Sequence, residues 1–439
     1  MSALALLARA RGVTITGCDT EPSGAADLAA QGVTVWRGHD PEHLTGVRAV
    51  VVTAAVAAEH PELQRARALG VPVVRRADAL AQVVAGGTVV GVAGTHGKTT
   101  TTVMLTEALA AAGRNPTGLA GGRVASWGGN ARIGGTDLFV VEADEFDRAF
   151  LALSPDVAVV TNVEADHLEC YGSVEALEAA FLEFAGRARH VIAGVDDAGA
   201  ARLAMRVGVP VWRLGTRGGA DVRIGDWRAT SEGSTATVTL PGERVVRLRL
   251  GVPGLHNVRN AAAALAAAAA LDAPLEPCAD ALAAFRGVGR RFERVGEAAG
   301  VTVVDDYAHH PTEVAATLAA ARQAYPGRRV VAVFQPHLFS RTALHGEALG
   351  GALAAADLVV VAPVYAAREA PLPGVTAELV VRAAIRAGAA TTGVRDRPAL
   401  AASIAGAVRS GDVVLTLGAG DVTRVGPELL GLLGNGGGA

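Results

Sequence analysis

Lysine is nearly absent from this chain of 439 residues. Among its 40 Lys and Arg residues, Lys98 is the single lysine, and Arg occupies every other basic position. Arg therefore serves wherever a basic surface group is needed, whereas the one compact and flexible ammonium lies in a glycine-rich segment, Gly91–Thr100. An ammonium of this kind binds phosphate as a point charge. This distribution points to nucleotide phosphoryl chemistry.

Cysteine is also scarce, and neither a long apolar run nor an excess of positive charge is present. The three cysteines, Cys18, Cys170 and Cys278, lie far apart and form no Cys-x-x-Cys, which argues against a disulfide framework or a zinc site and fits a reducing cytoplasm. No run reaches the ~18 apolar residues of a membrane helix, and the apolar start Met1–Leu7 lacks the charged region of a secretory signal. We expect an ordinary packed helix there. The net charge of the chain is -3, so it lacks the excess of positive charge that is typical of proteins that bind nucleic acid. We expect neither nucleic acid nor a membrane as a partner.

Short Val-rich segments alternate with Ala-rich helical stretches, which is typical of α/β units with parallel sheets. The predicted strands are Val47–Thr53, Thr88–Ala93, Leu138–Val141, Val157–Val160, Val301–Val304, Val330–Phe334, Leu358–Ala362 and Val413–Leu417. The pattern of strands and helices is interrupted near Ala85–Gly87 and near Phe285–Gly289. We therefore expect three domains, at about 1–87, 88–286 and 287–439. Alternation between Gly215 and Val252 predicts an antiparallel patch in the middle domain, and the run Ala261–Ala270 predicts a buried helix.

The segment around Lys98 has the layout of a phosphate-binding turn. Thr88–Ala93 is expected to form a buried strand and Thr99 to begin a helix, whose free N–H groups and dipole favour an anion. Lys98 would reach the β- and γ-phosphates of a nucleotide, and the Thr99 hydroxyl would hold Mg²⁺. The pattern departs from GxxxxGK[ST], because Val92 stands where the first glycine belongs. A glycine turn with a surface lysine remains the alternative.

Two clusters of acidic residues follow predicted strands. Val140–Glu145 ends in three carboxylates, and Thr161–His167 carries two carboxylates and a histidine. Because ligands gather at the carboxyl ends of parallel strands, both clusters should face the same crevice as the phosphate turn. Their oxygens, with an imidazole, suit Mg²⁺ that bridges ATP phosphates. The alternative is that these groups are solvated helix caps.

The chain contains six motifs, in this order: Gly94-Thr-His-Gly-Lys-Thr-Thr100, Glu142-Ala-Asp-Glu145, Thr161-Asn-Val-Glu-Ala-Asp-His167, His256-Asn-Val-Arg-Asn260, Asp305-Asp-Tyr-Ala-His-His-Pro311 and Phe334-Gln-Pro-His-Leu-Phe-Ser-Arg341. The same order is found in the Mur ligases, and the chain resembles that family from Met1 to about Leu430. Six ordered motifs are more specific than any single loop. Thr161–His167 is more similar to the alanine-adding members than to relatives that ligate a ready-made murein tripeptide.

The resemblance implies a fold, a reaction and partners. The fold would have a Rossmann-like UDP-sugar-binding domain, a central P-loop-type ATP-binding α/β domain and a C-terminal Rossmann-like amino-acid-binding domain. The reaction would be ATP-dependent ligation of L-alanine to the lactyl carboxylate of UDP-N-acetylmuramate through an acyl phosphate, a cytoplasmic step of peptidoglycan synthesis, by a monomer or weak dimer. The alternatives are a murein tripeptide ligase and a non-catalytic nucleotide-binding remnant.

The same resemblance implies roles for individual residues. Lys98, Glu142, His167 and His309 would be catalytic, with Thr99, Glu142 and His167 at magnesium. Asn257 is equally suited to capping the alanine helix, and Arg290 with Arg291 could be a solvated pair. The ATP-binding set would be Gly94, Thr95, His96, Gly97, Lys98, Thr99, Thr100, His256, Asn257, Asn260, Arg290 and Arg291.

The amino-acid pocket would be bounded by Tyr307, His309, His337 and Arg341, with the arginine fork on the α-carboxylate. His309, His310 and His337 are expected at two neighbouring strand ends; a lone histidine in such a loop is usually just a satisfied polar group. The resemblance also implies a binding site for the UDP-sugar, with Asp19 and Thr53 near the uridine.

The start of the chain departs from the family pattern. The ligases begin with a strand and a G-x-G-G-x-G-M loop that cradles the UDP diphosphate, whereas this chain opens at Met1–Leu4. Val13–Gly17 then resembles the second strand. Loss of the central first strand would split the sheet. We expect a start-site truncation of roughly 15–25 residues, an estimate based on one strand and a glycine loop, with ATP binding retained and UDP-N-acetylmuramate binding weakened.

Overall fold

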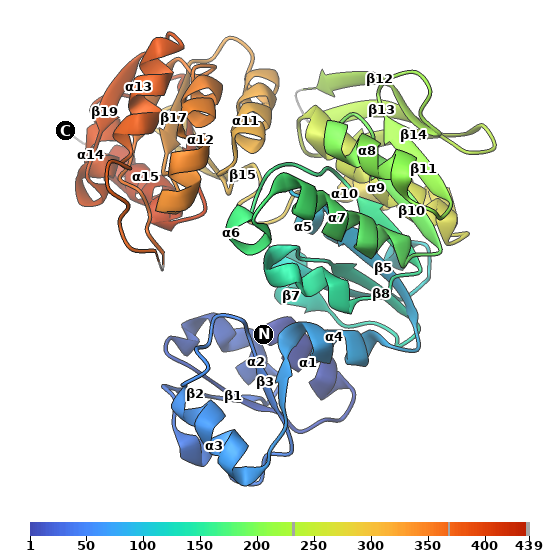
Figure 1. Ribbon diagram of the computed structural model, residues 1–439. Coiled ribbons are helices and arrows are strands. Elements are labelled where there is room, and N and C mark those ends of the chain that lie inside the picture. The colour runs from blue at the N-terminus through green and yellow to red at the C-terminus, as the bar shows by residue number, and fades with distance from the viewer. Residues whose placement is uncertain (231–232, 368, 436–439) are drawn as a thin grey trace. The chain divides into compact units, whose positions relative to one another are not determined.

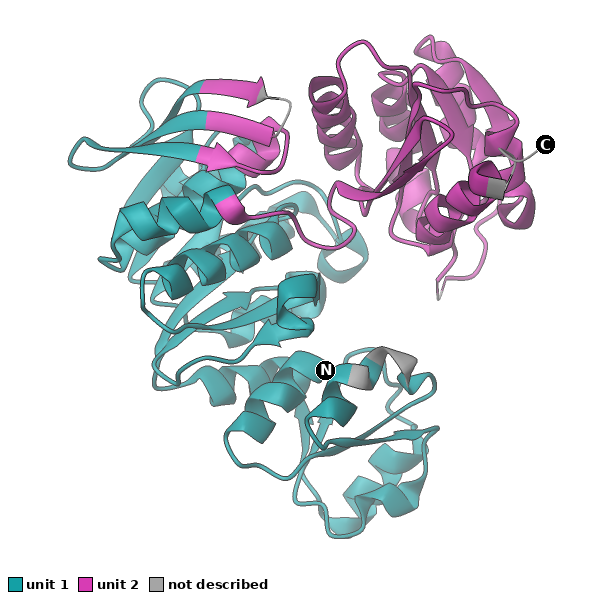
Figure 2. Cartoon of the chain, turned by 180° about the vertical axis from the view of Figure 1, so that it is seen from behind, with its two compact units in different colours: residues 1–226, 236–248, 259–283 teal, residues 227–235, 249–258, 284–439 magenta. Residues whose placement is uncertain are grey.

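The computed structural model describes residues 1–230, 233–367 and 369–435. Its contacts divide the chain into two compact units (Figure 2). Unit 1 comprises residues 1–226, 236–248 and 259–283, and unit 2 comprises residues 227–235, 249–258 and 284–439. Within the described residues, no helix is long and apolar enough to cross a membrane.

The first part of unit 1 contains two separate parallel sheets of two strands each, β1–β2 and β3–β4. The expected division of the N-terminal sheet is therefore confirmed. Its first strand begins at Thr16 rather than at Val13, because residues after α1 close that helix: Val13 N–H donates to Ala8 O at 3.1 Å. The elements are α1 (Ser2–Ala10), β1 (Thr16–Asp19), α2 (Ala26–Ala30), β2 (Thr34–Arg37), β3 (Val50–Val52), α3 (Pro61–Leu69), β4 (Val73–Arg75) and α4 (Arg76–Val84).

Within the described part of the chain, the central sheet has ten strands in the order β14-β13-β12-β11-β10-β9-β5-β8-β6-β7. Strand β5 pairs in parallel with β8 on one side and β9 on the other, so the segments that follow these three strands meet at one edge. Helices α5, α7 and α8 pack on the sheet (Figure 1). The strands are β5 (Thr88–Ala93), β6 (Thr117–Val124), β7 (Gly129–Arg132), β8 (Leu138–Glu142), β9 (Val157–Val160), β10 (His190–Gly194), β11 (Val211–Gly215), β12 (Val222–Thr230), β13 (Gly233–Leu240) and β14 (Arg244–Leu250).

The helices of this region include the predicted alanine helix. In α9 the side chains of residues 261–269 are all buried, which confirms the predicted buried helix. Small side chains permit this close packing on every side of the helix. The helices are α5 (Lys98–Ala111), α6 (Leu168–Tyr171), α7 (Val174–Gly186), α8 (Ala198–Arg206), α9 (Leu255–Ala270) and α10 (Leu275–Ala284).

The sheet of unit 2 has six strands in the order β15-β16-β20-β17-β18-β19. Strand β15 is antiparallel to β16, and the other pairs are parallel. Alternate residues face opposite cores: Val330, Ala332 and Phe334 pack with α11–α13, whereas Val331 and Val333 pack with α14 and α15. The elements are β15 (Glu293–Ala298), β16 (Val301–Asp306), α11 (Pro311–Ala324), β17 (Val330–Phe334), α12 (Phe339–Leu353), β18 (Leu358–Val361), α13 (Glu378–Arg386), β19 (Thr391–Val394), α14 (Leu400–Ala405), β20 (Val413–Leu417) and α15 (Val425–Asn435).

The order of these strands corrects one expectation. Strands β16 and β17, whose ends carry His309 and His337, are not neighbours, because β20 pairs with both of them. The two histidines therefore follow strands that are one strand apart in the sheet, yet their rings lie 6.1 Å from each other.

Candidate active site

The loop Gly94–Gly97 joins β5 to α5 and leaves no room for side chains at its two glycines. Gly94 has a φ of +139°, and a Cβ there would lie 2.0 Å from Thr161 Oγ1. Gly97 has a φ of +82°, and its Cβ would lie 2.5 Å from Asn260 Oδ1. Only glycine fits both the backbone conformation and the space. The loop thus brings backbone close to the segment after β9 and to α9.

Backbone and side-chain hydrogen bonds fix this loop against residues 161–164. The His96 N–H donates to Asn162 Oδ1 at 2.8 Å, and Asn162 Nδ2 donates to His96 O at 3.1 Å. Thr95 Oγ1 accepts from Glu164 N at 2.8 Å. The strand end that carries Thr161–His167 therefore holds the phosphate-type loop in shape, which the sequence did not predict.

Lys98 is the first residue of α5, and its ammonium is held at the mouth of the loop. Nζ donates to Gly94 O at 2.6 Å, to Thr95 O at 3.2 Å and to Glu145 Oε1 at 2.9 Å. Burial alone would lower the pKa of Lys98, but the carboxylates of Glu145, Asp144 and Glu142 outweigh it and hold the pKa above its usual value. Lys98 is therefore a fixed, protonated cation at a helix N-terminus.

Thr99 and Glu142 place two oxygen ligands side by side. Thr99 Oγ1 donates to Glu142 Oε1 at 2.9 Å, and Gly121 N–H donates to Glu142 Oε2 at 2.5 Å. A Cβ at Gly121 would lie 2.6 Å from Glu142 Oε1, so this glycine makes room for the carboxylate. A hydroxyl and a carboxylate beside a phosphate-type loop are oxygen donors of the kind that Mg²⁺ takes. Thr100 follows Thr99 and is buried in α5.

His167 contacts a different group of residues. It has a φ of +52°, its backbone N–H donates to Asp166 Oδ1 at 2.8 Å, and Nδ1 lies 3.3 Å from Glu169 Oε1. Its ring packs edge-on against Phe146 at a centroid distance of 5.1 Å. These contacts give His167 a constrained position after β9, beside Phe146.

Helix α9 carries the three predicted adenine contacts on its first turns. Asn260 is buried and lies against Gly97 of the loop. Asn257 is also buried, and its Nδ2 donates to Pro253 O at 2.8 Å, which is a local bond at the helix start. His256 precedes it and lies close to Gly254. Asn257 thus donates to a carbonyl that precedes the helix, whereas an N-cap side chain accepts from a helix N–H, and Asn260 lies against the loop.

In unit 2, the ring of Tyr307 lies between two arginines. The guanidinium carbons of Arg290 and Arg291 are each 4.9 Å from its centroid. Arg290 also pairs with the buried Asp305, with Nε 3.2 Å from Oδ2, and donates to Gly418 O at 2.6 Å. These bonds tie Arg290 to its own sheet edge, so Arg290 is not simply solvated.

His309 and His337 share one surface of this edge. His309 packs edge-on against Tyr307 at 5.2 Å and lies 6.1 Å from the ring of His337. Glu313 anchors His309, because its Oε2 accepts from the His309 N–H at 3.0 Å. His337 stacks on Tyr365 with the ring planes 14° apart. The structure therefore brings three of the four predicted pocket residues together; Arg341, in the first turn of α12, is half-buried.

The two predicted uridine residues follow different sheets. Asp19 ends β1, where its Oδ1 accepts from Glu21 N at 3.0 Å. Thr53 follows β3 and accepts through its carbonyl from Val56 N at 3.2 Å. Both residues lie at carboxyl ends of strands, as ligand-binding residues of parallel sheets do.

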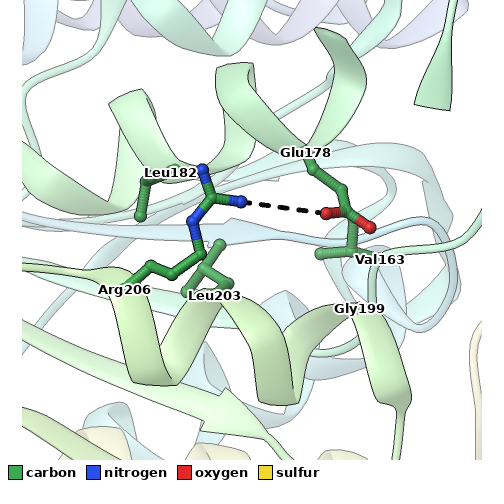
Figure 3. A pocket seen from close by; sticks show the side chains of 6 residues that line it. All are labelled: Val163, Glu178, Leu182, Gly199, Leu203 and Arg206. Carbon is green, nitrogen blue, oxygen red and sulfur yellow. Dashed lines mark ion pairs between the residues drawn. The ribbon is translucent and has the colours of Figure 1, made fainter. Parts of the chain in front are cut away.

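One small hollow in unit 1 lies away from this chemistry. Figure 3 shows that its lining residues come from α7, α8 and the segment after β9, and that Arg206 points toward Glu178 across it, with an N–O distance of 4.0 Å. No residue of the predicted site lines this hollow. Its lining residues are Val163, Glu178, Leu182, Gly199, Leu203 and Arg206.

Four residues that hold the predicted site residues in place were given no role in the sequence analysis. Glu145 neutralises Lys98, Gly121 holds Glu142, Glu313 anchors His309, and Tyr365 stacks on His337. Glu145 lies within the Glu142–Glu145 motif that the sequence analysis identified. The other three lie outside strongly patterned segments or form contacts that only the fold creates.

Comparison with known proteins gives a consistent result over the whole chain. The sequence patterns of the Mur ligase family catalytic domain, the Mur ligase middle domain and the Mur ligase glutamate ligase domain match residues 1–88, 92–268 and 290–420. The UDP-N-acetylmuramate–L-alanine ligase of Kineococcus radiotolerans is 50% identical over 99% of this chain and 94% of that protein. The Streptomyces avermitilis protein of the same name is 47% identical over 98% of this chain and 94% of that protein.

Solved structures agree with the sequence comparison. The UDP-N-acetylmuramate–alanine ligase of Thermotoga maritima superposes with a TM-score of 0.83 at 29% identity, covering 99% of this chain and 97% of that one. A murein peptide ligase of Psychrobacter arcticus gives a TM-score of 0.72 at 27% identity, covering 99% and 96%. The likeness to the alanine ligase is thus the greater of these two.

Proposed function

The chain belongs to the Mur ligase family, and we propose that it joins L-alanine to the lactyl carboxylate of UDP-N-acetylmuramate with consumption of ATP. The single observation that carries the proposal is the group formed by Lys98, Thr99 and Glu142 at the N-terminus of α5, in a chain that matches alanine ligases from end to end. We place the reaction in the cytoplasm, as a step of peptidoglycan synthesis, and the protein as a monomer or weak dimer.

The reaction needs ATP because a carboxylate is a poor electrophile. Transfer of the γ-phosphoryl group to the lactyl carboxylate gives an acyl phosphate and ADP, and the phosphate then becomes a good leaving group. In this proposal the Gly94–Gly97 loop and the N-terminus of α5 bind the nucleotide phosphates, and Lys98 neutralises charge on the group in transfer. To do so, the ammonium exchanges one of its loop carbonyl contacts for a phosphate oxygen.

Thr99 and Glu142 fit a magnesium site, because two oxygen donors already lie within 2.9 Å of each other beside the loop. When bound there, Mg²⁺ would supply positive charge to the phosphate oxygens. His167, an imidazole after the neighbouring strand β9, is the third proposed ligand. The Gly121 N–H keeps the Glu142 carboxylate oriented toward Thr99.

The second step concerns unit 2. The neutral amine of alanine attacks the acyl phosphate, the tetrahedral intermediate releases phosphate, and the amide remains. We propose that Arg341 binds the α-carboxylate of alanine as a fork and that Tyr307, His309 and His337 bound the pocket. The contact of Glu313 with His309 would hold that imidazole in place.

Dependence of ADP release on substrates tests the function. We expect steady ADP release only when ATP, UDP-N-acetylmuramate and L-alanine are all present, with one ADP formed for each UDP-N-acetylmuramoyl-alanine. Replacing alanine with a murein tripeptide should stop turnover. ADP release with the tripeptide instead of alanine would assign the chain to murein peptide ligases. Nucleotide binding without turnover under every condition would identify a non-catalytic module and overturn the proposal.

A further inference from the structure

A second group of metal-ligating side chains lies in the N-terminal part of unit 1, outside the proposed active site. It comprises Cys18 on β1, His39 in the segment after β2 and Glu62 in the first turn of α3 (Figure 1). Cys18 Sγ lies 3.3 Å from His39 Nδ1 and 3.3 Å from Glu62 Oε2. His39 Nδ1 lies 3.4 Å from the same Oε2. The three atoms form a nearly equilateral triangle.

This triangle has the size of one face of a zinc coordination tetrahedron. Bonds of about 2.3 Å to sulfur and 2.0–2.2 Å to nitrogen and oxygen, at tetrahedral angles, separate the ligand atoms by about 3.4–3.6 Å. The observed separations of 3.3–3.4 Å need little adjustment. A thiolate, an imidazole and a carboxylate together favour a borderline metal such as Zn²⁺ over Mg²⁺ or Ca²⁺, which prefer oxygen ligands throughout.

The surroundings of Glu62 hold its carboxylate ready for such a bond. Oε1 accepts from the Asp40 N–H at 3.2 Å and lies 3.2 Å from His43 Nδ1. The Cys18 thiol lies 3.1 Å from Oε1 and 3.3 Å from Oε2, and Oε2 also faces the imidazole of His39. Trp36 stacks on His43 with a centroid distance of 4.4 Å, which fixes that ring. Glu62 itself is only 8% exposed. Groups that orient a ligating carboxylate in this way are typical of metal sites.

We propose that Cys18 Sγ, His39 Nδ1 and Glu62 Oε2 bind one Zn²⁺, with a water molecule as the fourth ligand. On binding, the metal replaces the thiol proton, which passes to solvent. The ligands come from β1, the segment after β2 and α3, so the metal would fasten the β1–β2 sheet to a helix that lies beyond β3 in the chain. The absence of a Cys-x-x-Cys argued against a zinc site at the level of sequence, whereas these ligands lie 21 and 23 residues apart (from 18 to 39 and from 39 to 62).

Cobalt substitution of the full-length protein tests the site. With Mg²⁺ in excess, Co²⁺ should bind one equivalent and give a thiolate-to-cobalt charge-transfer band, which Zn²⁺ then abolishes by displacement. The Cys18→Ser variant should lose the band, whereas the matched Cys170→Ser variant should keep it, because Cys170 lies in α6. The His43→Phe variant keeps a ring to stack on Trp36 but removes the contact to Oε1, so its dissociation constant for Zn²⁺ should rise about 10–100-fold.

Circular dichroism and thermal unfolding of each metal-free variant distinguish a lost site from a lost fold. Zn²⁺ should raise the Tm of the parent chain and of Cys170→Ser, and leave that of folded Cys18→Ser and His39→Ala unchanged, because only binding to the native state stabilises it. A charge-transfer band that survives in Cys18→Ser, or the absence of stoichiometric binding in the parent chain, would overturn the proposal. The cluster would then be a hydrogen-bonded network around Glu62.

Discussion

Lys98 and Glu145 form a buried ion pair at the N-terminus of α5, with Nζ 2.9 Å from the carboxylate and side chains 14% and 2% exposed. The pair holds the ammonium against the carbonyls of the Gly94–Gly97 loop. A pair this deeply buried is costly to break, because the remaining charge loses its partner. The alternative of a glycine turn with a surface lysine is therefore wrong, and the single lysine of the chain has a defined position.

Replacing Lys98 with Arg should abolish ligation although the charge is retained. A planar guanidinium does not fit a site in which one compact ammonium contacts two carbonyls and a buried carboxylate. We expect turnover below about a tenth of the parent value, a barrier increase above ~1.4 kcal/mol. Initial rates of ADP release measure this.

A matched variant controls for the Lys–Arg exchange itself. Arg223→Lys changes an exposed pair with Glu243 and should leave turnover unchanged. Circular dichroism of Lys98→Arg must show a folded chain for the comparison to count. A folded Lys98→Arg that keeps more than a tenth of the parent rate would remove Lys98 from the proposed role.

Gly97→Ala should weaken nucleotide binding. An alanine there adopts a φ of +82°, which costs about 1–2 kcal/mol, and its Cβ meets Asn260 Oδ1 at 2.5 Å. The buried asparagine has to move, and the loop moves with it. Gly113→Ala isolates the backbone cost, because Gly113 has a φ of +75° and nothing within 4 Å. Calorimetric ATP titration should show weaker binding in Gly97→Ala alone; equal affinities in the two variants would contradict the prediction.

The parts of the site that sequence could predict rest on local signals. Thr88–Ala93 is a continuous apolar run before a glycine turn, and β5 has those same bounds, with Lys98 opening the helix. Because β5 lies between β8 and β9, both acidic segments reach the edge that the sequence assigned to them. Apolar periodicity and parallel-sheet geometry were sufficient there.

Features that depend on pairing between distant segments were not predictable. Strand β20 inserts between β16 and β17, and no local pattern in Val413–Leu417 records which strands it joins. The Lys98–Glu145 pair spans 47 residues and depends on how the segment after β8 turns back to α5. Likewise, the contact between Cys18 and Glu62 exists only because α3 packs beside β1.

Arg341→Ala should raise the KM for alanine far more than the KM for ATP. The change removes the proposed partner of the amino-acid carboxylate, and a charge-assisted hydrogen bond contributes about 1.5–3 kcal/mol, or about 10–150-fold in affinity. The matched variant Arg382→Ala removes an exposed arginine from α13 and should change neither KM. Steady-state kinetics with each substrate varied in turn measure both constants. Equal increases for alanine and ATP would place Arg341 outside the alanine pocket.

The stability of unit 2 should depend on pH through Asp306. Burial raises the pKa of this carboxyl to about 6, although Arg291 and the N–H groups of Ala308 and Phe292 favour its ionised form. Between pH 4 and 6 the folded chain therefore binds more protons at this position than the unfolded chain, so the contribution of Asp306 to stability falls as the pH rises. A difference of about 2 pKa units corresponds to at most ~3 kcal/mol.

Asp306→Asn should remove this contribution because an amide does not titrate. The variant loses one backbone hydrogen bond at every pH, since its NH₂ group does not accept from Phe292 N or Ala308 N. Its deficit relative to the parent is largest at pH 4, where the parent's neutral carboxyl carries no buried charge. The difference in Tm between the parent and the variant should shrink as the pH rises from 4 to 7, because the parent progressively pays for a buried charge that the variant lacks. Asp396→Asn, at an exposed aspartate of the same unit, controls for the exchange of aspartate for asparagine. A pH profile of Tm for Asp306→Asn parallel to that of the parent would show that Asp306 titrates alike in the folded and unfolded chains.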